Sequence, residues 1–426
     1  LILVSVTDFV IGRLLAATEA KPYRRGLVAL SVLINLGMLA YFKYTNLFIQ
    51  IANDLAGHDV LAFRNIFLPV GISFFVFQSM SYTIDIYRRQ LTPLTCWLDY
   101  FFYLSFFPQL VAGPIVRARD FIPQIRQNPL RVTREMFGRG LFLIMTGLVK
   151  KAVISDYISV NFVDRVFDNP MLYSGFENLM GVYGYALQIY CDFSGYSDMA
   201  IGIALLLGFR FPKNFDSPYK SATITEFWRR WHISLSTWLK DYLYISLGGN
   251  RKGRFRTYVN LVVTMLLGGL WHGAAPRFVL WGGFHGLLLA LHKFLMRLFP
   301  RMKATGADMK RRWRIAGIFV TFHLVCLGWI FFRARDVGTG ADILEQVFTN
   351  FDISLIPNII TGYWEIFAMM LVGYVAHFTP RRLQERACDA VIRNPLAVNA
   401  LLIVVIIWVV MQVKSADIQP FIYFQF

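Results

Sequence analysis

The chain has 426 residues, of which 56% are hydrophobic and 16% are charged. Because soluble domains carry about 25% charged residues, this composition argues against a soluble domain and indicates a protein embedded in lipid. The formal net charge of +17 does not predict a nucleic-acid partner, since lysine and arginine also gather in the cytoplasmic loops of membrane proteins.

Apolar segments follow one another along the whole chain, and a spanning helix needs about 20 mostly apolar residues to cross the bilayer. Segment 173–208 is long enough for two passes or for one long tilted helix. No internal repeat is visible, so we expect a single transmembrane domain over residues 1–426. Leu1 lies inside an apolar run, and we expect the natural start to precede it. The candidate spans are 1–17, 26–50, 66–87, 94–116, 138–162, 173–208, 258–275, 278–299, 314–332, 362–378 and 397–413.

The basic residues predict an orientation. Four basic loops alternate with poorly basic ones, and the loop 336–360 is acidic, so the positive-inside rule places the basic loops in the cytoplasm. The first third departs from this alternation, because Arg24-Arg25 and Arg88-Arg89 compete for the inside; re-entrant segments would explain it. The basic loops are 117–139, 209–257, 300–314 and 379–396.

Polar residues concentrate in region 192–286, between apolar spans. Ionisable groups at membrane depth cost roughly 2.5–3.5 kcal/mol each and normally face a cavity or a partner, so we take 192–286 as the catalytic region. Thr223 and Glu226 form a capping-box pattern. The helix that they open is expected to run to Gly248-Gly249, which places Trp228, His232 and Ser236 on one face.

Other residues of this helix are candidates for substrate binding. Arg229 and Arg230 point away from the shared face, which suits lipid headgroups or a phosphate-rich acyl donor. Asp241 and Asn250 are weaker candidates, expected mainly to fix helix ends. Three tryptophans fit an interfacial or half-inserted helix: Trp228, Trp231 and Trp238.

His272 is the candidate general base. It lies in the sequence GGLWHGA, where glycines allow close backbone approach and leave room for a substrate. Fourteen residues from Tyr258 place it roughly 20 Å from the cytoplasmic end of its helix. A neutral imidazole at this depth suits proton abstraction from a hydroxyl group. The alternative is a histidine that only bonds a helix neighbour.

The remaining chemistry-bearing residues receive lower priority. Trp271 and His285 are candidates for substrate binding, although helix packing explains His285 equally well. No metal site is expected, because no HExxH motif or compact ligand spacing occurs. No serine-hydrolase elbow or phosphate-binding loop occurs either. The four cysteines form no CxxC pair and are interpreted as unpaired thiols.

Seven stretches of the sequence carry longer motifs: Asp192–Gly202, Glu226–Leu239, Asp241–Tyr244, Leu247–Arg251 and Gly269–Ala274, together with Phe106–Ile115 and Pro420–Phe426. These motifs closely resemble the alginate O-acetyltransferase (AlgI) branch of the membrane-bound O-acyltransferase (MBOAT) superfamily. The resemblance covers most of the chain. The sequence departs from the branch at Ala275-Pro276-Arg277, directly after the histidine motif.

This resemblance implies a bundle of about 11 transmembrane or re-entrant helices around a central tunnel, in the bacterial inner membrane. It implies that His272 is the catalytic residue and that His232 is a second site histidine. The donor would be acetyl-CoA or another acetyl thioester, with no bound cofactor. A periplasmic partner of the SGNH-hydrolase kind would complete transfer to an exported polysaccharide, with alginate as the first choice.

Three alternatives stay open at this point. The same chemistry could serve peptidoglycan, cellulose or another exopolysaccharide, or deliver D-alanine to teichoic acids. The chain could instead be a polysaccharide transporter, although it lacks inverted repeats. It could also be an inactive scaffold, against which both histidines argue.

Overall fold

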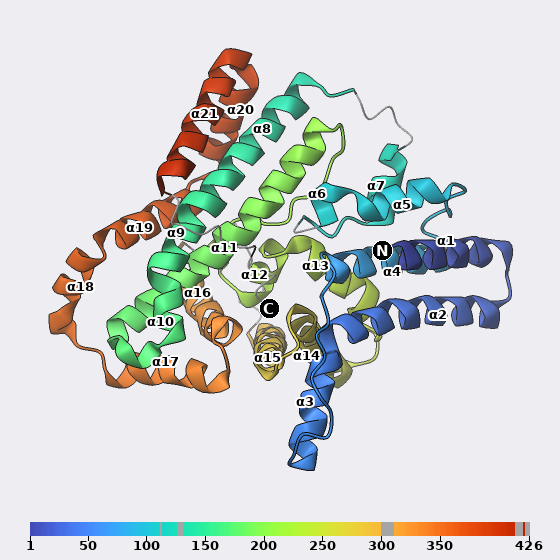
Figure 1. Ribbon diagram of the computed structural model, residues 1–426, viewed down its shortest axis with the longest axis horizontal. Coiled ribbons are helices and arrows are strands. Elements are labelled where there is room, and N and C mark those ends of the chain that lie inside the picture. Colours follow the sequence, from blue (N-terminus) through green and yellow to red (C-terminus); the bar gives the residue numbers. More distant parts are fainter. Residues whose placement is uncertain (111–112, 126–130, 300–310, 414–420, 422–426) are drawn as a thin grey trace.

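The computed structural model describes residues 1–110, 113–125, 131–299, 311–413 and 421. Within these ranges the regular structure is helical throughout (Figure 1). The predicted all-α polytopic class is therefore correct. Of the expected stretches, Pro420–Phe426 lies outside the described residues except for Phe421, and most of loop 300–314 also lies outside them.

The first helices form an arm on one side of the molecule (Figure 1). A buried polar contact joins three of them, because Oδ2 of Asp8 accepts hydrogen bonds from Asn35 at 2.6 Å and from Ser79 at 2.5 Å. The expected span 26–50 is one continuous run with a π-helical turn in its middle. The elements are α1 (Ile2–Ala17), α2 (Lys21–Leu39), the π-helix η1 (Ala40–Tyr44), α3 (Thr45–Ala56) and α4 (Ile72–Tyr87).

The expected span 94–116 is not one helix. It is divided into α5 (Trp97–Ser105) and α6 (Phe107–Leu110), and α7 (Ala118–Ile125) follows. Pro108 and Pro114 explain the division, because proline has no backbone N–H and disfavours helical conformation in the residue before it.

Two long helices, α8 and α11, lie side by side (Figure 1). Segment 173–208 is a single helix, α11 (Gly175–Leu206), so the one-helix alternative is the correct one. Its glycines let α8 approach closely: a Cβ on Gly147 would lie 2.6 Å from the carbonyl oxygen of Gly195. The preceding elements are α8 (Arg134–Leu148), η2 (Val149–Ser155), α9 (Asp156–Ile158), η3 (Ser159–Val163), α10 (Asp164–Asp168) and η4 (Pro170–Leu172).

Charged side chains of α11 and of the η2–α9 segment that follows α8 pair with one another. Lys150 Nζ lies 2.6 Å from Asp198, and Lys151 Nζ lies 2.5 Å from Asp192 and 2.7 Å from Asp156. The polar residues that interrupt these apolar segments are therefore paired, as buried charges in a membrane require.

The helix expected from Thr223 to Gly248 is broken, which corrects the sequence prediction. Thr223 does cap its start, since its hydroxyl oxygen accepts the N–H of Glu226 at 3.1 Å. The chain then leaves the helical conformation at His232, so Trp228, His232 and Ser236 do not share one helix face. The observed elements are η5 (Pro218–Lys220), α12 (Ile224–Arg230), α13 (Ile233–Trp238) and the π-helix η6 (Leu239–Tyr244).

The remaining helices surround this central segment. Among the residues the structure describes, four helices are long and apolar enough to cross a membrane, or up to five if the bent pair Ile353–Gly362 and Trp364–Phe378 counts as one span. The expected number of about 11 transmembrane or re-entrant helices is thus not confirmed. These helices are α14 (Arg254–His272), α15 (Pro276–Leu298), α16 (Arg311–Arg333), α17 (Val337–Thr349), η9 (Ile353–Leu355), α18 (Ile356–Gly362), α19 (Trp364–Phe378), α20 (Arg381–Arg393) and α21 (Leu396–Val413).

Candidate active site

His272 is the last residue of α14 and is 4% exposed. Its imidazole ring lies among aromatic rings, with centroid distances of 5.0 Å to Trp271, 5.1 Å to Trp281 and 5.3 Å to Phe332. A helix of 19 residues rises about 28 Å, so the start and end of α14 are separated by about the thickness of the hydrocarbon region. The ring is therefore far from the basic loop that precedes the helix.

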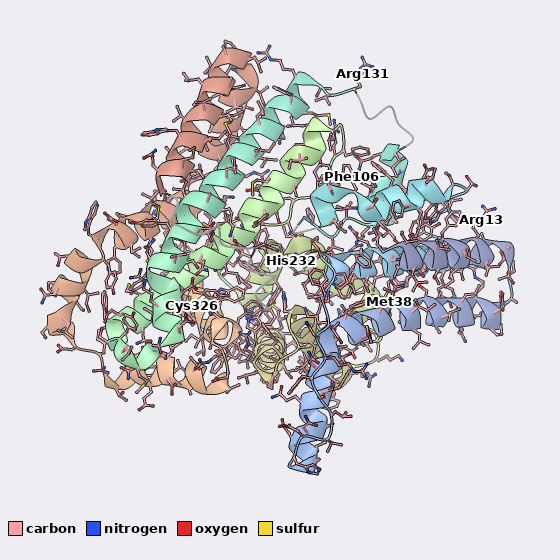
Figure 2. The ribbon with its side chains drawn as sticks, viewed as in Figure 1. Arg13, Met38, Phe106, Arg131, His232 and Cys326 are labelled. Carbon is pink, nitrogen blue, oxygen red and sulfur yellow. The ribbon has the colours of Figure 1, made fainter. Side chains whose placement is uncertain are left out.

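His232 lies in the left-handed region, with φ of 41° and ψ of 57°, and is fully buried. A non-glycine residue in this region costs on the order of 1–3 kcal/mol and persists only where the surroundings fix it. Asn214 supplies those surroundings: its carbonyl oxygen accepts the N–H of Ile233 at 2.8 Å, and its Oδ1 accepts the N–H of Ser234 at 3.2 Å. These bonds start α13 and separate it from α12. Figure 2 shows His232 near the centre of the molecule.

The same asparagine sets the protonation of the ring. Oδ1 of Asn214 lies 3.2 Å from Nδ1 of His232. Because Oδ1 also takes the backbone N–H of Ser234, it is an acceptor, and Nδ1 must carry the proton. In the neutral ring Nε2 then holds a lone pair, and no hydrogen-bond partner for Nε2 is found in the described part of the chain.

Trp271 brings the two histidines together. Its ring lies next to His272 in sequence and 6.1 Å from the ring of His232, centroid to centroid. Its indole N–H donates to the carbonyl oxygen of Ser73 at 3.2 Å. The two predicted catalytic residues thus flank one buried indole that α4 holds in place.

His285 belongs to a neighbouring aromatic cluster. Its ring lies 4.9 Å from Trp281 and 5.2 Å from Trp228. Both ring nitrogens of His285 and the indole nitrogens of Trp228 and Trp281 are buried, and none of them has a hydrogen-bond partner among the described residues. A buried polar group without a partner costs about 1–3 kcal/mol. This cluster is therefore a place where a polar ligand group would be stabilised.

The three tryptophans are buried within the protein. Their exposed fractions are 9% for Trp228, 3% for Trp231 and 6% for Trp238, and all three pack in the hydrophobic core. The interfacial or half-inserted position of these segments stays a prediction.

The two adjacent arginines, Arg229 and Arg230, lie in different surroundings. Arg229 is exposed, whereas Arg230 pairs with Glu226 at 2.8 Å and with Asp216 at 3.6 Å. Burial would raise the pKa of Asp216, but the hydrogen bond and charge of Lys213 and the charge of Arg230 lower it below its usual value. Neither arginine is brought to the histidines by the contacts of its side chain.

Asn250 and Asp241 lie on the surface side of this segment. Oδ1 of Asn250 accepts from Tyr244 at 2.5 Å and from Lys293 at 2.7 Å, so its contacts fix a turn. Asp241 pairs with Arg117 at 2.7 Å.

Asp241 also lines an open pocket of about 410 Å³. Two arginines contribute to this pocket, and the rings of Tyr242, Trp238 and Phe77 pack from its wall inward to Trp271. The pocket and the site histidines are therefore linked by packed aromatic rings. The lining residues are Asp85, Arg88, Gln90, Arg119, Asp241, Tyr242, Ile245 and Ser246.

The departure at Ala275-Pro276-Arg277 has a structural explanation. Pro276 occupies the first turn of α15, where its missing N–H is not needed. Arg277 donates to the carbonyl oxygens of Phe332 at 2.9 Å and Ala334 at 2.6 Å. It thereby holds the end of α16, whose Phe332 contacts His272.

Sequence reasoning placed Asn214 among the polar residues of 192–286 without giving it a specific role, and it missed Lys43. Asn214 acts through bonds to a segment almost twenty residues later, which no local pattern reveals. Lys43 is a single charge in an apolar run, a signal that could have marked it. Within the described ranges, no group of three His, Cys, Asp or Glu side chains could hold a metal ion. The absence of a metal site stays a prediction.

Comparison with known proteins gives one family and several relatives. The model of the membrane-bound O-acyltransferase family matches residues 90–334. The chain is 38% identical to a probable alginate O-acetylase AlgI of Pseudomonas putida, over 96% of this chain and 86% of that protein. It is 42% identical to the protein of the same name from Pseudomonas aeruginosa, over 81% and 65%. It is 36% identical to a peptidoglycan O-acetyltransferase of Helicobacter pylori, over 80% and 68%.

Proposed function

The chain belongs to the membrane-bound O-acyltransferase family, and we propose that it transfers an acetyl group from a cytoplasmic donor across the membrane for O-acetylation of an exported polysaccharide. The observation that carries this proposal is that His272 and His232 flank the same buried indole of Trp271. The names of its relatives favour alginate as the acceptor.

The proposed reaction is transfer of an acetyl group from a thioester to a hydroxyl group. His272 accepts the hydroxyl proton while the oxygen attacks the thioester carbonyl, so that a C–O bond forms. The tetrahedral intermediate then loses the thiolate as the C–S bond breaks, and the proton returns from His272 to the thiolate. General-base assistance of this kind is worth about 10²–10⁴-fold in rate.

His232 would orient the reactants. Its Nδ1 proton is directed to Asn214, so a neutral ring presents a hydrogen-bond acceptor at Nε2. A ring in this state cannot donate to an oxyanion, and an oxyanion role would require the imidazolium. We therefore favour a hydrogen bond from an N–H or O–H group of a substrate to Nε2.

The donor would be acetyl-CoA or another acetyl thioester. Its phosphates would bind at the pocket that contains Arg88 and Arg119. Arginine binds phosphate through paired N–H groups, and this pocket is open, whereas Arg230 already pairs with two carboxylates. The pocket replaces the Arg229-Arg230 pair as our candidate for donor binding.

The acceptor side would lie across the bacterial inner membrane. There, a periplasmic partner of the SGNH-hydrolase kind would complete the transfer to the polysaccharide. Peptidoglycan is the second candidate acceptor, because one relative is named for it.

Mass spectrometry of exported glycans, with and without the gene, tests the proposal. Loss of acetyl ester from one polysaccharide on deletion, restored by the gene on a plasmid, is expected and identifies the acceptor. Unchanged acetylation of alginate, peptidoglycan and cellulose would contradict the proposal. A change in the amount of exported polymer at constant acetylation would favour a transporter instead.

A further inference from the structure

The last turn of α14 is held by a side chain that lies 228 residues before Trp271 in the sequence. Lys43 Nζ donates to the carbonyl oxygens of Trp271 at 2.7 Å and of His272 at 2.8 Å. The neighbouring hydroxyl of Tyr44 donates to the carbonyl oxygen of Leu270 at 2.5 Å. Three successive carbonyl groups at the end of the helix therefore receive hydrogen bonds from two adjacent residues.

These carbonyls need such partners. The last carbonyls of a helix have no partner within it, and many helices end with a left-handed glycine whose N–H returns to them. At the end of α14 Gly273 is extended, with φ of −161° and ψ of 153°. The ammonium of Lys43 and the hydroxyl of Tyr44 take over this task.

Placing the charged Lys43 side chain in an apolar segment costs free energy, and its contact with the end of α14 offsets that cost. It lies in the apolar run Lys21–Ala56, and it is half-buried. An ammonium in such a segment costs roughly 2.5–3.5 kcal/mol on insertion scales. The negative end of the α14 dipole is the favourable partner for a cation, and water-poor surroundings strengthen the attraction.

The π-helical turn η1 (Ala40–Tyr44) places both donors at this point. A π-turn inserts an extra residue into a helix and is frequent at functional sites. Figure 1 shows the junction of α2 and α3 beside α14. The deviation from regular helix thus falls where the first arm of the molecule meets the end of α14.

We propose that Lys43 is a positioning residue for His272, fixing its backbone by capping the last two carbonyls of α14. This inference rests on the proposed role of His272. A helix end without partners frays, and His272 is the final helical residue. Holding its carbonyl fixes the direction in which the imidazole leaves the helix, while the Trp271 indole bond to Ser73 fixes the preceding residue.

The test compares three lysine variants in inside-out membrane vesicles that are given acetyl-CoA. Lys43→Met keeps the side-chain length but removes the donors, and Lys43→Arg keeps charge and donors. Lys220→Met is the matched control, because Lys220 Nζ also bonds a carbonyl at a helix end, that of Thr379 after α19, at 2.8 Å. The acetylation of exported polysaccharide in complemented cells is measured in parallel.

We expect Lys43→Met to lower kcat about tenfold to hundredfold, with KM for acetyl-CoA changed less than about threefold. Lys43→Arg should recover most of the rate, and Lys220→Met should keep it, all at equal amounts of folded protein. If Lys43→Met keeps the wild-type kcat, or if Lys43→Arg is no better than Lys43→Met, the proposal is overturned.

Two further variants cover the case in which Lys43→Met does not fold and separate the role of Lys43 from the proposed function. If Lys43→Met does not fold, Tyr44→Phe tests the same cap through the bond to Leu270, with a smaller loss of kcat expected and no loss contradicting the proposal. A His272→Ala variant is measured alongside. Full activity in that variant would overturn the proposed function, whereas its inactivity combined with a fully active Lys43→Met would overturn only the role of Lys43.

Discussion

Oδ1 of Asn214 lies 3.2 Å from Nδ1 of His232, and the backbone carbonyl of the same asparagine accepts the N–H of Ile233. One residue thus both breaks the helix at His232 and determines which ring nitrogen is left to accept a hydrogen bond. The orientation of the second site histidine is therefore built by a loop residue outside its own helix.

Removing the side-chain amide of Asn214 should impair the function of His232 while leaving the histidine itself in place. We expect Asn214→Ala to lower kcat about tenfold to hundredfold, which corresponds to about 1.4–2.7 kcal/mol. The reason is that Nδ1 loses its acceptor and the backbone at His232 loses part of its support. Acetyl transfer per folded molecule is the measurement. Asn358→Ala, on an exposed position of α18, is the control; equal rates in the two variants would contradict the role of Asn214.

The donor pocket can be tested through Arg119, whose contacts within the protein are weak. It lies 3.5 Å from Gln90 and 3.9 Å from Asp120. We expect Arg119→Gln to raise KM for acetyl-CoA about fivefold with kcat nearly unchanged, because a phosphate contact is lost. The difference should shrink at high salt. Arg139→Gln, which removes an exposed pair with Glu135, is the control. An unchanged KM in Arg119→Gln would place the donor phosphates elsewhere.

Gly328 tests the cluster around His285. A Cβ at Gly328 would lie 2.8 Å from Nε2 of His285, so an alanine must displace the imidazole or the helix. We expect Gly328→Ala to lower kcat at least tenfold and to cost about 1–3 kcal/mol of stability, typical of overpacking. Kinetics and thermal unfolding in detergent measure both. Gly37→Ala in α2 is the control, since its Cβ would meet nothing within 4 Å. Wild-type kcat in Gly328→Ala would contradict this prediction.

Much of the fold could be predicted because helices that cross a lipid bilayer need long apolar segments, which are visible in the sequence. Most of the predicted apolar segments contain helices, and the position of His272 near the end of one was expected from the bounds of the span 258–275. The number of crossings could not be predicted, because short and bent helices such as α18 and α19 have the same composition as spans. Apolar composition reports burial or lipid contact but does not separate the two.

The candidate site was less predictable than the helices. The capping pattern at Thr223 correctly indicated where α12 begins. The break that follows at His232 depends on Asn214, which lies before the helix in sequence. Arg229 and Arg230 were favoured for the donor because of their charge alone, and the partners of Arg230 become visible only in three dimensions. Contacts between residues far apart in the sequence therefore determine the helix break at His232 and the pairing of Arg230, which local sequence patterns do not reveal.

The most direct test of the account is the rate of polysaccharide O-acetylation by a His272→Ala variant that is folded and inserted at the wild-type level. His323→Ala is the matched control, because both of its ring nitrogens already have protein partners, Tyr183 and the carbonyl of Phe319, at 2.8 Å each. We expect His272→Ala to lose about 10²–10⁴-fold in rate and His323→Ala to stay within about threefold of wild type. Undiminished O-acetylation by His272→Ala would contradict the account.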